Sequence, residues 1–354
     1  YIVGSTAAYI VHSTNTAIGG STLLGTNVIG AAVWFSSGNV GLTVSSSILA
    51  GGASGAVVRL DYGSEGLIRL STNTIMATSR YGVYVTTQVA AARIWLASNT
   101  ILGSVGAGVD RYGIYLDGLR TGATIQNNGI YYRASGTMAG NAAYALFVKS
   151  GAGIVFEKNR INNPGMITGG SFYGAYLSDA DNVRFKFNDV HSSAPALTNA
   201  YLLRAGEDST GLTVKNNIFA SSFTAPGTSS GTLIIDAGST NGYAGNYNDF
   251  YSSNSLLSFS WGGAAAQGLL AWRTLTGQDA VSIADHPLWA NLGVAVEDFH
   301  PRSTVGRFNP ATQTFVLDAT LSTTIDSGDP AESYAVETSP NGGRVNQGSY
   351  ANTA

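Results

Sequence analysis

Several acidic side chains come directly after short apolar stretches of similar sequence. The members of this group, here called the acidic edge, are Asp117, Asp179, Asp181, Glu207, Asp208 and Asp236. Two close carboxylates can act as a general acid and base, and a larger group can hold a calcium ion. Lys149 and Arg204 fall in the same region, so carboxylates that are neutralised or solvated in turns are the alternative. We assign no catalytic residue and no metal ligand from this pattern, and calcium is the one cofactor it suggests.

A second candidate group consists of aromatic residues at the centre of four similar stretches, 81–85, 112–116, 144–148 and 173–177, the first of which reads Tyr-Gly-Val-Tyr-Val. Side chains alternate between the two faces of a strand. Because apolar residues flank the central aromatic, that residue is predicted to face outward. The four outward residues are Tyr84, Tyr115, Phe147 and Tyr176. They are candidate carbohydrate-binding residues, since sugar rings stack on aromatic faces; the alternative is that they stabilise a sheet by stacking on one another.

The histidines give no further candidate. His12, His191, His286 and His300 share no spacing that indicates a metal site or a catalytic triad. His286 and His300 each precede a proline, which is typical of turns.

These candidate residues lie within a repeated pattern: an apolar residue, a second apolar residue two positions later, an Asn three after that, and a third apolar residue two beyond the Asn. The clearest copy is 183–190, and others are 68–75, 94–101, 154–161 and 212–219, with weaker copies centred on Asn27, Ser47, Asn128 and Asn246. Successive centres are 20 to 31 residues apart. A repeat of this period with strand-like alternation inside it predicts a solenoid.

The Asn of each copy is predicted to bend the chain, because Asn takes positive φ more readily than most residues. Together with the aromatic stretch, each turn then contains three short strands. Turns stacked at the strand spacing place equivalent Asn side chains in a column where they bond amide to amide. The predicted Asn ladder is Asn27, Asn73, Asn99, Asn128, Asn159, Asn188, Asn217 and Asn246.

This repeat resembles that of the right-handed parallel β-helix proteins, which include pectate lyases, polygalacturonases and many bacterial surface proteins. The resemblance implies an all-β solenoid whose first strand in each turn is the Tyr-Gly stretch, the face that binds polysaccharide in the pectin-degrading relatives. The Asn-Thr-Asp, Gly-His-Gly and Arg-Ile-Lys motifs of polygalacturonases are absent. No family catalytic residue is therefore transferred to this chain.

The repeat divides the chain into coils over residues 1–251 and a C-terminal segment over 252–354 that resembles the closing region of bacterial β-helix surface proteins. Residues 264–275 are predicted to form a short helix with Leu269, Trp272 and Leu275 on one face, ended by Gly277. We expect this segment to be an irregular cap over the open end of the core. The N-terminal end shows no comparable cover, so we expect more protein or a partner to lie there.

Composition excludes some partners. Charged residues make up 11% and the net charge is −3, so there is no basic surface for nucleic acid. No apolar run approaches the about 20 residues of a membrane-spanning helix. Without cysteine, the chain has neither disulfides nor thiolate metal sites.

These observations favour a non-enzymatic structural or adhesive module of a bacterial surface protein, located outside the cell or at its surface. Its partners would be a polysaccharide or other copies of itself, in a homo-oligomer, filament or layer. The alternatives are a polysaccharide lyase or glycoside hydrolase acting along the first-strand face, and a trimeric module like those of phage tailspikes.

Overall fold

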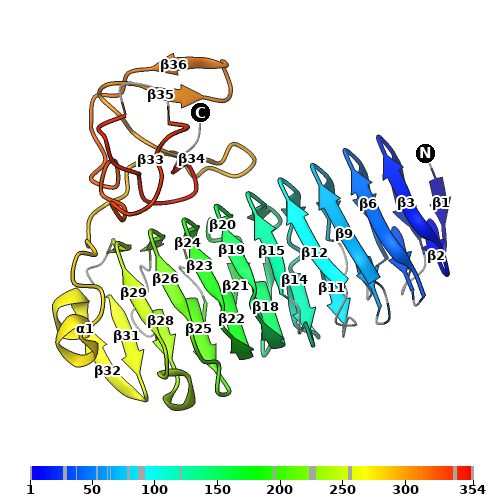
Figure 1. Ribbon diagram of the computed structural model, residues 1–354, viewed down its shortest axis with the longest axis horizontal. Helices are drawn as coiled ribbons and strands as arrows, with labels where there is room; N and C mark the ends of the chain where they lie inside the picture. The colour runs from blue at the N-terminus through cyan, green and yellow to red at the C-terminus, as the bar shows by residue number, and fades with distance from the viewer. Residues whose placement is uncertain are drawn as a thin grey trace.

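The structure is a computed structural model that describes residues 2–351 apart from 27–29, 37, 53–54, 62, 64, 78–79, 87–91, 120–121, 194–196, 223–228, 254–256 and 338–340. Its main body is a coil with three walls, each a sheet of stacked short strands (Figure 1). Each turn passes through sheet B, then sheet C, then sheet A. The three strands per turn predicted from the repeat are confirmed.

The strands of the three walls are as follows. Sheet A contains β1 (Ile2–Gly4), β4 (Thr22–Gly25), β7 (Ile48–Ala50), β10 (Thr74–Met76), β13 (Thr100–Leu102), β16 (Gly129–Tyr131), β20 (Arg160–Asn163), β24 (Asp189–Ser193), β27 (Ile218–Ser222) and β30 (Asp249–Ser252). Sheet B contains β2 (Ala8–Ile10), β5 (Val33–Phe35), β8 (Ala56–Leu60), β11 (Tyr81–Thr86), β14 (Arg111–Asp117), β18 (Ala142–Ala152), β22 (Ser171–Asp181), β25 (Asn199–Gly206), β28 (Ser229–Ile235), β31 (Ser258–Trp261) and β32 (Ala264–Gln267). Sheet C contains β3 (Thr14–Gly19), β6 (Val40–Ser45), β9 (Glu65–Ser71), β12 (Ala92–Ala97), β15 (Ala123–Gln126), β19 (Val155–Glu157), β23 (Arg184–Lys186), β26 (Thr213–Lys215) and β29 (Ala244–Asn246).

Parallel pairing puts equivalent apolar residues directly above one another inside the coil. In sheet A, Ile75 pairs with Ile101, which pairs with Ile130. These side chains are almost completely buried, and the core they form is continuous along the coil. Because every turn contributes the same inward pattern, the core grows with the number of turns rather than with the radius of a globule.

The Asn ladder is the main polar feature of this core. In each turn the side-chain Nδ2 donates to Oδ1 of the Asn one turn later, at 2.9 to 3.0 Å. The ladder consists of Asn73, Asn99, Asn128, Asn159, Asn188, Asn217 and Asn248, each at most 2% exposed. A backbone carbonyl accepts a second bond from each Nδ2, as Ile125 does from Asn159 at 2.8 Å. The amides are thus satisfied although they are buried.

The bend differs from our expectation in one respect. The positive φ belongs to the residue before each ladder Asn and not to the Asn, as at Thr72 (55°), Ser98 (56°) and Lys158 (56°). The left-handed residue interrupts the strand alternation, so the side chain that follows it is turned into the core. A short polar side chain at that next position then reaches the turns on either side.

Two members of the predicted ladder, Asn246 and Asn27, are not among the ladder residues of the structure. The prediction that Asn246 belongs to the ladder was wrong. Asn248 accepts the bond from Asn217, while Asn246 Oδ1 accepts from the backbone N–H groups of Tyr247 and Val281. The reason is register, since Phe250 pairs with Phe219 and fixes the ladder position two residues before it. Asn27 lies outside the described residues. Ser47, the centre of a weaker copy, donates its N–H to Asn73 Oδ1 at 3.1 Å and so extends the ladder.

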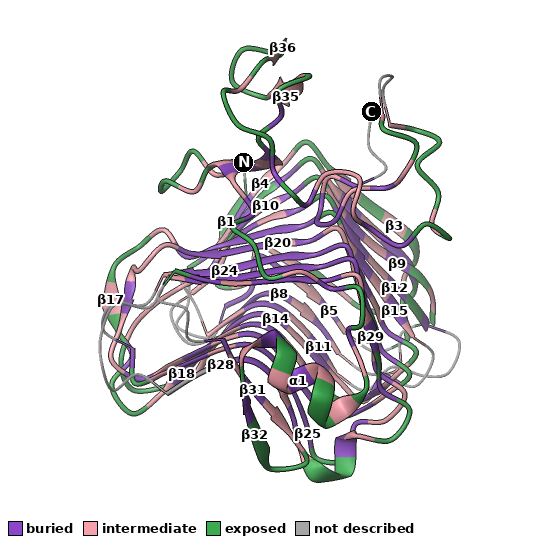
Figure 2. Ribbon diagram, turned by 90° about the vertical axis from the view of Figure 1, so that its left-hand side faces the viewer, coloured by how far each residue is buried: buried purple, intermediate pink, exposed green. Residues whose placement is uncertain are grey.

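The longest connections run from sheet A to sheet B. Two of them form a small parallel ladder of their own, in which β17 (Gly136–Thr137) pairs with β21 (Ile167–Thr168). Figure 2 shows β17 projecting to one side of the coil, away from the three walls.

The C-terminal end of the core is covered by α1 (Gly268–Thr276), which follows the antiparallel pair β31–β32. Trp272 is completely buried and stacks on Phe259 with ring centroids 5.1 Å apart. The predicted helix therefore exists and ends at Gly277 in the left-handed conformation, but it begins at Gly268 because the residues before it form β32. Leu275 is exposed. Strand pairing with the coils continues to β31, beyond residue 251.

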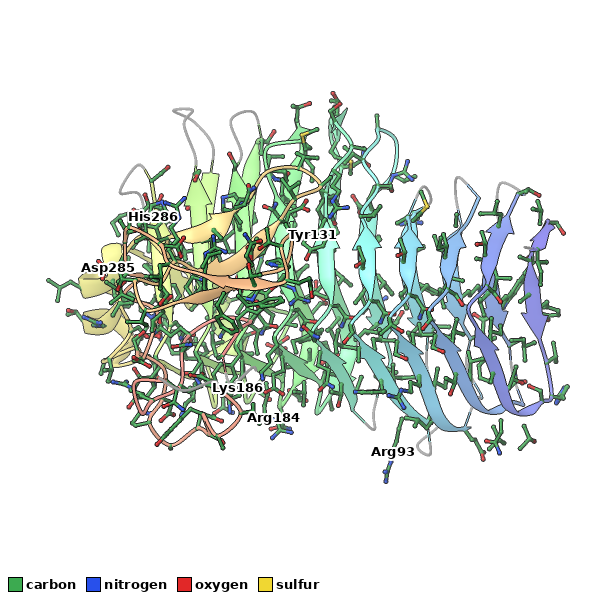
Figure 3. The ribbon with its side chains drawn as sticks, turned by 90° about the horizontal axis from the view of Figure 1, so that it is seen from above. Arg93, Tyr131, Arg184, Lys186, Asp285 and His286 are labelled. Atoms are coloured by element: carbon green, nitrogen blue, oxygen red, sulfur yellow. The ribbon has the colours of Figure 1, made fainter. Side chains whose placement is uncertain are left out.

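The rest of the C-terminal segment lies along the outside of the coil and does not cover its end (Figures 1 and 3). It contains two short antiparallel pairs, β33 (Trp289–Asn291) with β34 (Asp298–Pro301) and β35 (Arg307–Asn309) with β36 (Thr314–Val316). The short helix η1 (Ala237–Ser239) lies earlier in the chain, within the coils. Trp289 and Phe299 pack on Tyr131 and Ile218 of sheet A. Ion pairs from Arg133 to Glu297, Lys186 to Glu332 and Lys215 to Asp329 tie the segment to three turns. We call residues 278–351 the side cap.

No helix in the described ranges is both long and apolar enough to cross a membrane.

Candidate functional site

The outer surface of sheet B carries the aromatic residues singled out from the sequence. Tyr84, Tyr115, Phe147 and Tyr176 lie in register on neighbouring turns and are half-buried, whereas their neighbours Val83 and Val85 are buried in the core. Beside this column runs a second one, which the sequence reasoning missed. It consists of Tyr81, Tyr112, Tyr144, Tyr173 and Tyr201. We call the two columns together the tyrosine face.

The second column faces outward because the strand alternation is broken between its residues and the first column. Tyr81 and Tyr84 are three positions apart, yet their ring centroids are 4.8 Å apart on the same face. Gly82 lies between them, and a Cβ at this position would come within 2.5 Å of the carbonyl oxygen of Gly113. A glycine inside a strand marks a close approach of another backbone, and its recurrence at Gly113 and Gly174 is the signal that could have revealed the second column.

Most neighbouring rings within each column stack on one another, whereas Phe147 and Tyr176 meet at 79°. Tyr112 lies 5.0 Å from both Tyr81 and Tyr144, with interplanar angles of 14° and 8°. Tyr115 and Phe147 are likewise 5.0 Å apart at 11°. Parallel rings at the turn spacing cover each other's faces, so the ring edges, and not the faces, point away from the wall. Face-on stacking of a sugar ring is therefore blocked over most of the tyrosine face.

Charges border the tyrosine face. The first column of aromatics ends against Arg59, which pairs with Tyr84 in register, and Arg204, which pairs with Tyr176. Arg59 bonds to Asp61 at 2.8 Å and Arg204 to Asp236 at 2.9 Å, so both cations are neutralised locally. Burial, followed by the charge of Asp110, raises the pKa of Tyr112 to about 12. At neutral pH this phenol stays protonated and can donate a hydrogen bond, but it cannot serve as a general base.

Most members of the acidic edge bond to neighbouring turns. Asp179 accepts from Ser150 Oγ at 2.9 Å, and Asp181 accepts from the backbone N–H of Thr210 at 3.0 Å. Glu207 accepts from Ser178 Oγ. Asp117 and Asp208 take part in none of the side-chain bonds found among the described residues. The structure thus distributes the predicted acidic edge along the coil as separate pairings between turns.

In the part of the chain that the structure describes, no three acidic or histidine side chains converge so that they could hold a metal ion. The calcium that the acidic edge suggested therefore has no assigned ligands.

Two buried carboxyl groups lie elsewhere, between sheet A and the side cap, and sequence reasoning missed them. Asp189 and Asp249 are buried two strands apart on sheet A, and both follow a ladder Asn directly. Asp189 Oδ2 accepts from the backbone N–H and the hydroxyl of Ser349, and Asp249 Oδ1 accepts from the N–H of Asp285 at 3.0 Å. Burial raises the pKa of Asp189 to about 7 despite these bonds.

Two histidines also lie at this contact. His191 Nδ1 is 2.8 Å from Asn162 Oδ1, and burial lowers the pKa of His191 to about 4. His286 packs on Tyr251 with ring centroids 4.6 Å apart. Figure 3 shows His286, Asp285 and Tyr131 among the strands of the side cap, whereas Arg93 points into solvent beyond it. The acids and His191 are sealed by the side cap, which fits a docking contact better than a substrate site.

Comparison with known proteins agrees with this architecture. Residues 90–264 match the family described as a right handed beta helix region. Neither the curated proteins nor the solved structures yielded a match. The match covers the turns in which the Asn ladder and the tyrosine face are most regular, and the three stacked parallel walls are those of such a helix. The chain is therefore a right-handed parallel β-helix protein.

Proposed function

We propose that this chain is a non-enzymatic structural module that works outside the cell, as a stiff rod that holds adjoining parts or surfaces at a fixed separation. The observation that supports this most is the continuous Asn ladder, in which seven buried amides join successive turns. Ten strands in sheet A give the rod a length of about 43 Å at the usual strand spacing.

The outer surface supports the same role. The rings of the tyrosine face stack between turns, and Asp179, Asp181 and Glu207 bond between turns as well. Groups that a hydrolase or lyase would aim at substrate are here used to join the turns of the wall. Phenol hydroxyls at the ring edges give this face hydrogen-bond donors, which suits weak adhesion to a polysaccharide.

A load-bearing role can be tested by pulling the full chain between its two ends in a single-molecule force experiment. The ladder is loaded in every turn, so the wild-type coils should unfold at higher force than the Asn159→Leu variant, whose ladder is interrupted. Asn241→Leu, an exposed position outside the ladder, is the matched control and should unfold at the wild-type force. Equal unfolding forces for wild type and Asn159→Leu would contradict the proposal.

A further inference from the structure

The side cap contains a cavity that the proposed function does not use. It has a volume of about 390 Å³ and lies between β34, the β35–β36 hairpin and the part of the side cap that follows β36. This volume falls within the about 300–1,000 Å³ usual for small-molecule sites. The side cap is outside the region that matches the β-helix family, so the cavity is not part of the repeat.

One wall of the cavity is a row of aromatic rings. His300 stacks on Tyr350 with ring centroids 3.5 Å apart, and Phe308 lies 6.1 Å from His300 and 5.9 Å from Phe315. Phe315 is 59% exposed although it lines the cavity. Val305 and Leu321, also exposed, add an apolar rim. Clustered exposed apolar side chains of this kind mark binding sites on soluble proteins.

The charge in the cavity is negative. Asp326 and Glu337 line it, and no described residue donates a hydrogen bond or an ion pair to the Asp326 carboxylate. The carboxylate packs against Gly342, where a Cβ would lie 1.8 Å from Oδ2, so its place depends on the glycine.

The cations nearby are already engaged. Arg307 lines the cavity, but its guanidinium bonds to Asp318 at 2.8 Å and to Asp298 at 3.3 Å. The charge of Arg344 acts on Asp326, but the hydrogen bond from Arg344 Nε goes to the carbonyl oxygen of Gly328 at 2.6 Å. The lining therefore presents an aromatic wall and, to the same space, a carboxylate that makes no side-chain hydrogen bond or ion pair with a described residue.

We propose that this cavity binds a small organic cation, an ammonium group carried on an apolar or aromatic body. The ammonium would sit between the Asp326 carboxylate and the ring of Phe308, since aromatic faces attract cations, while the apolar body would cover Phe315 and Leu321. An anion would meet the carboxylates, and a neutral apolar ligand would cover the half-buried Asp326 carboxylate without giving it a partner.

The test uses the full chain and titrates it with 2-phenylethylammonium, with 2-phenylethanol as the neutral counterpart and phenylacetate as the anionic one. Calorimetry and NMR shifts of the aromatic side chains report binding. We expect saturable one-to-one binding of the ammonium, and affinity for the alcohol and the acid lower by about tenfold or more, the size of one lost charged contact.

Two variants and two matched controls assign the site. Asp326→Asn and Phe315→Ala should each weaken ammonium binding by about tenfold. Leu317→Ala, on the same hairpin and 74% exposed but outside the lining, and Glu65→Gln, an exposed acid on the distant β9, should bind as wild type does. Equal affinity for the ammonium and the alcohol, an unchanged affinity in Asp326→Asn, or no saturable binding would each overturn the proposal.

Discussion

The side-chain Nδ2 of Asn159 donates to Oδ1 of Asn188 in the next turn at 2.9 Å, and the backbone N–H of Asn159 donates to the same oxygen at 3.0 Å. One buried oxygen thus anchors both the side chain and the main chain of its neighbour. Asn159 in turn accepts from Asn128. Removing the Asn159 side chain therefore leaves buried polar groups without partners in the turns on both sides.

Replacing Asn159 by Leu should destabilise the coil by about 3 kcal/mol or more, because several buried donors and acceptors lose their partners and each costs about 1–3 kcal/mol. Urea unfolding measures the change. The matched control Asn241→Leu should unfold within about 0.5 kcal/mol of wild type, as exposed substitutions usually do. A wild-type midpoint for Asn159→Leu would show that the ladder contributes little.

The corrected ladder register makes a separate prediction about Asn248 and Asn246. Asn248 is completely buried and donates to Val214 and Asp279, whereas Asn246 is half-exposed and its side-chain oxygen accepts from backbone N–H groups. Asn248→Leu should therefore lower the free energy of unfolding more than Asn246→Leu. Urea unfolding of the two variants measures this difference. A larger loss of unfolding free energy in Asn246→Leu than in Asn248→Leu would support the register expected from the sequence.

The positive φ of Lys158 predicts an order of stability among substitutions at that residue. A left-handed conformation costs an ordinary L-residue about 1–2 kcal/mol, costs glycine little and is worst for β-branched residues. Lys158→Gly should match or exceed wild type in the free energy of unfolding, and Lys158→Val should fall below it. Thermal and urea unfolding would refute this if Val were the more stable of the two.

Docking of the side cap should depend on pH through Asp189. Its folded pKa is raised to about 7 by burial, so the neutral acid is favoured in the docked state. A raised pKa contributes stability that is fully present below the unfolded value, near 4, and lost as pH rises through about 7. Burial raises the pKa of Asp249 in the same direction, while His191, with its pKa lowered to about 4, acts with the opposite sign.

Comparison of the wild type with Asp189→Asn isolates this contribution. Amide exchange or limited proteolysis of residues 278–351 should show the side cap loosening in the wild type, relative to the variant, as pH rises from 4 to 7. The Asn side chain keeps a hydrogen-bond acceptor for Ser349 and carries no charge at any pH. Identical pH profiles for the two proteins would exclude Asp189 as the titrating group.

The order of the strands, the inward residues and most of the ladder could be predicted because the repeat places the same side chains at the same step of every turn. Asn246 was misassigned because Gly245 stands where Val214 and Phe185 stand in earlier turns, so the apolar landmark was missing. The second tyrosine column depends on a break in the alternation of side chains at Gly82, which a strictly alternating pattern does not predict. Contacts such as Ser349 with Asp189, 160 residues apart, join non-repeating segments, and no local pattern encodes them.

The most direct test of the structural role is incubation of the protein with a panel of acidic and neutral polysaccharides, with and without Ca²⁺. Unsaturated ends formed by a lyase are followed by their ultraviolet absorbance, and new reducing ends formed by a hydrolase are measured in parallel. The account predicts that neither product forms. Either product, formed by the wild type and lost in the Asp117→Asn or Asp181→Asn variant, would contradict it and make the acidic edge a catalytic site.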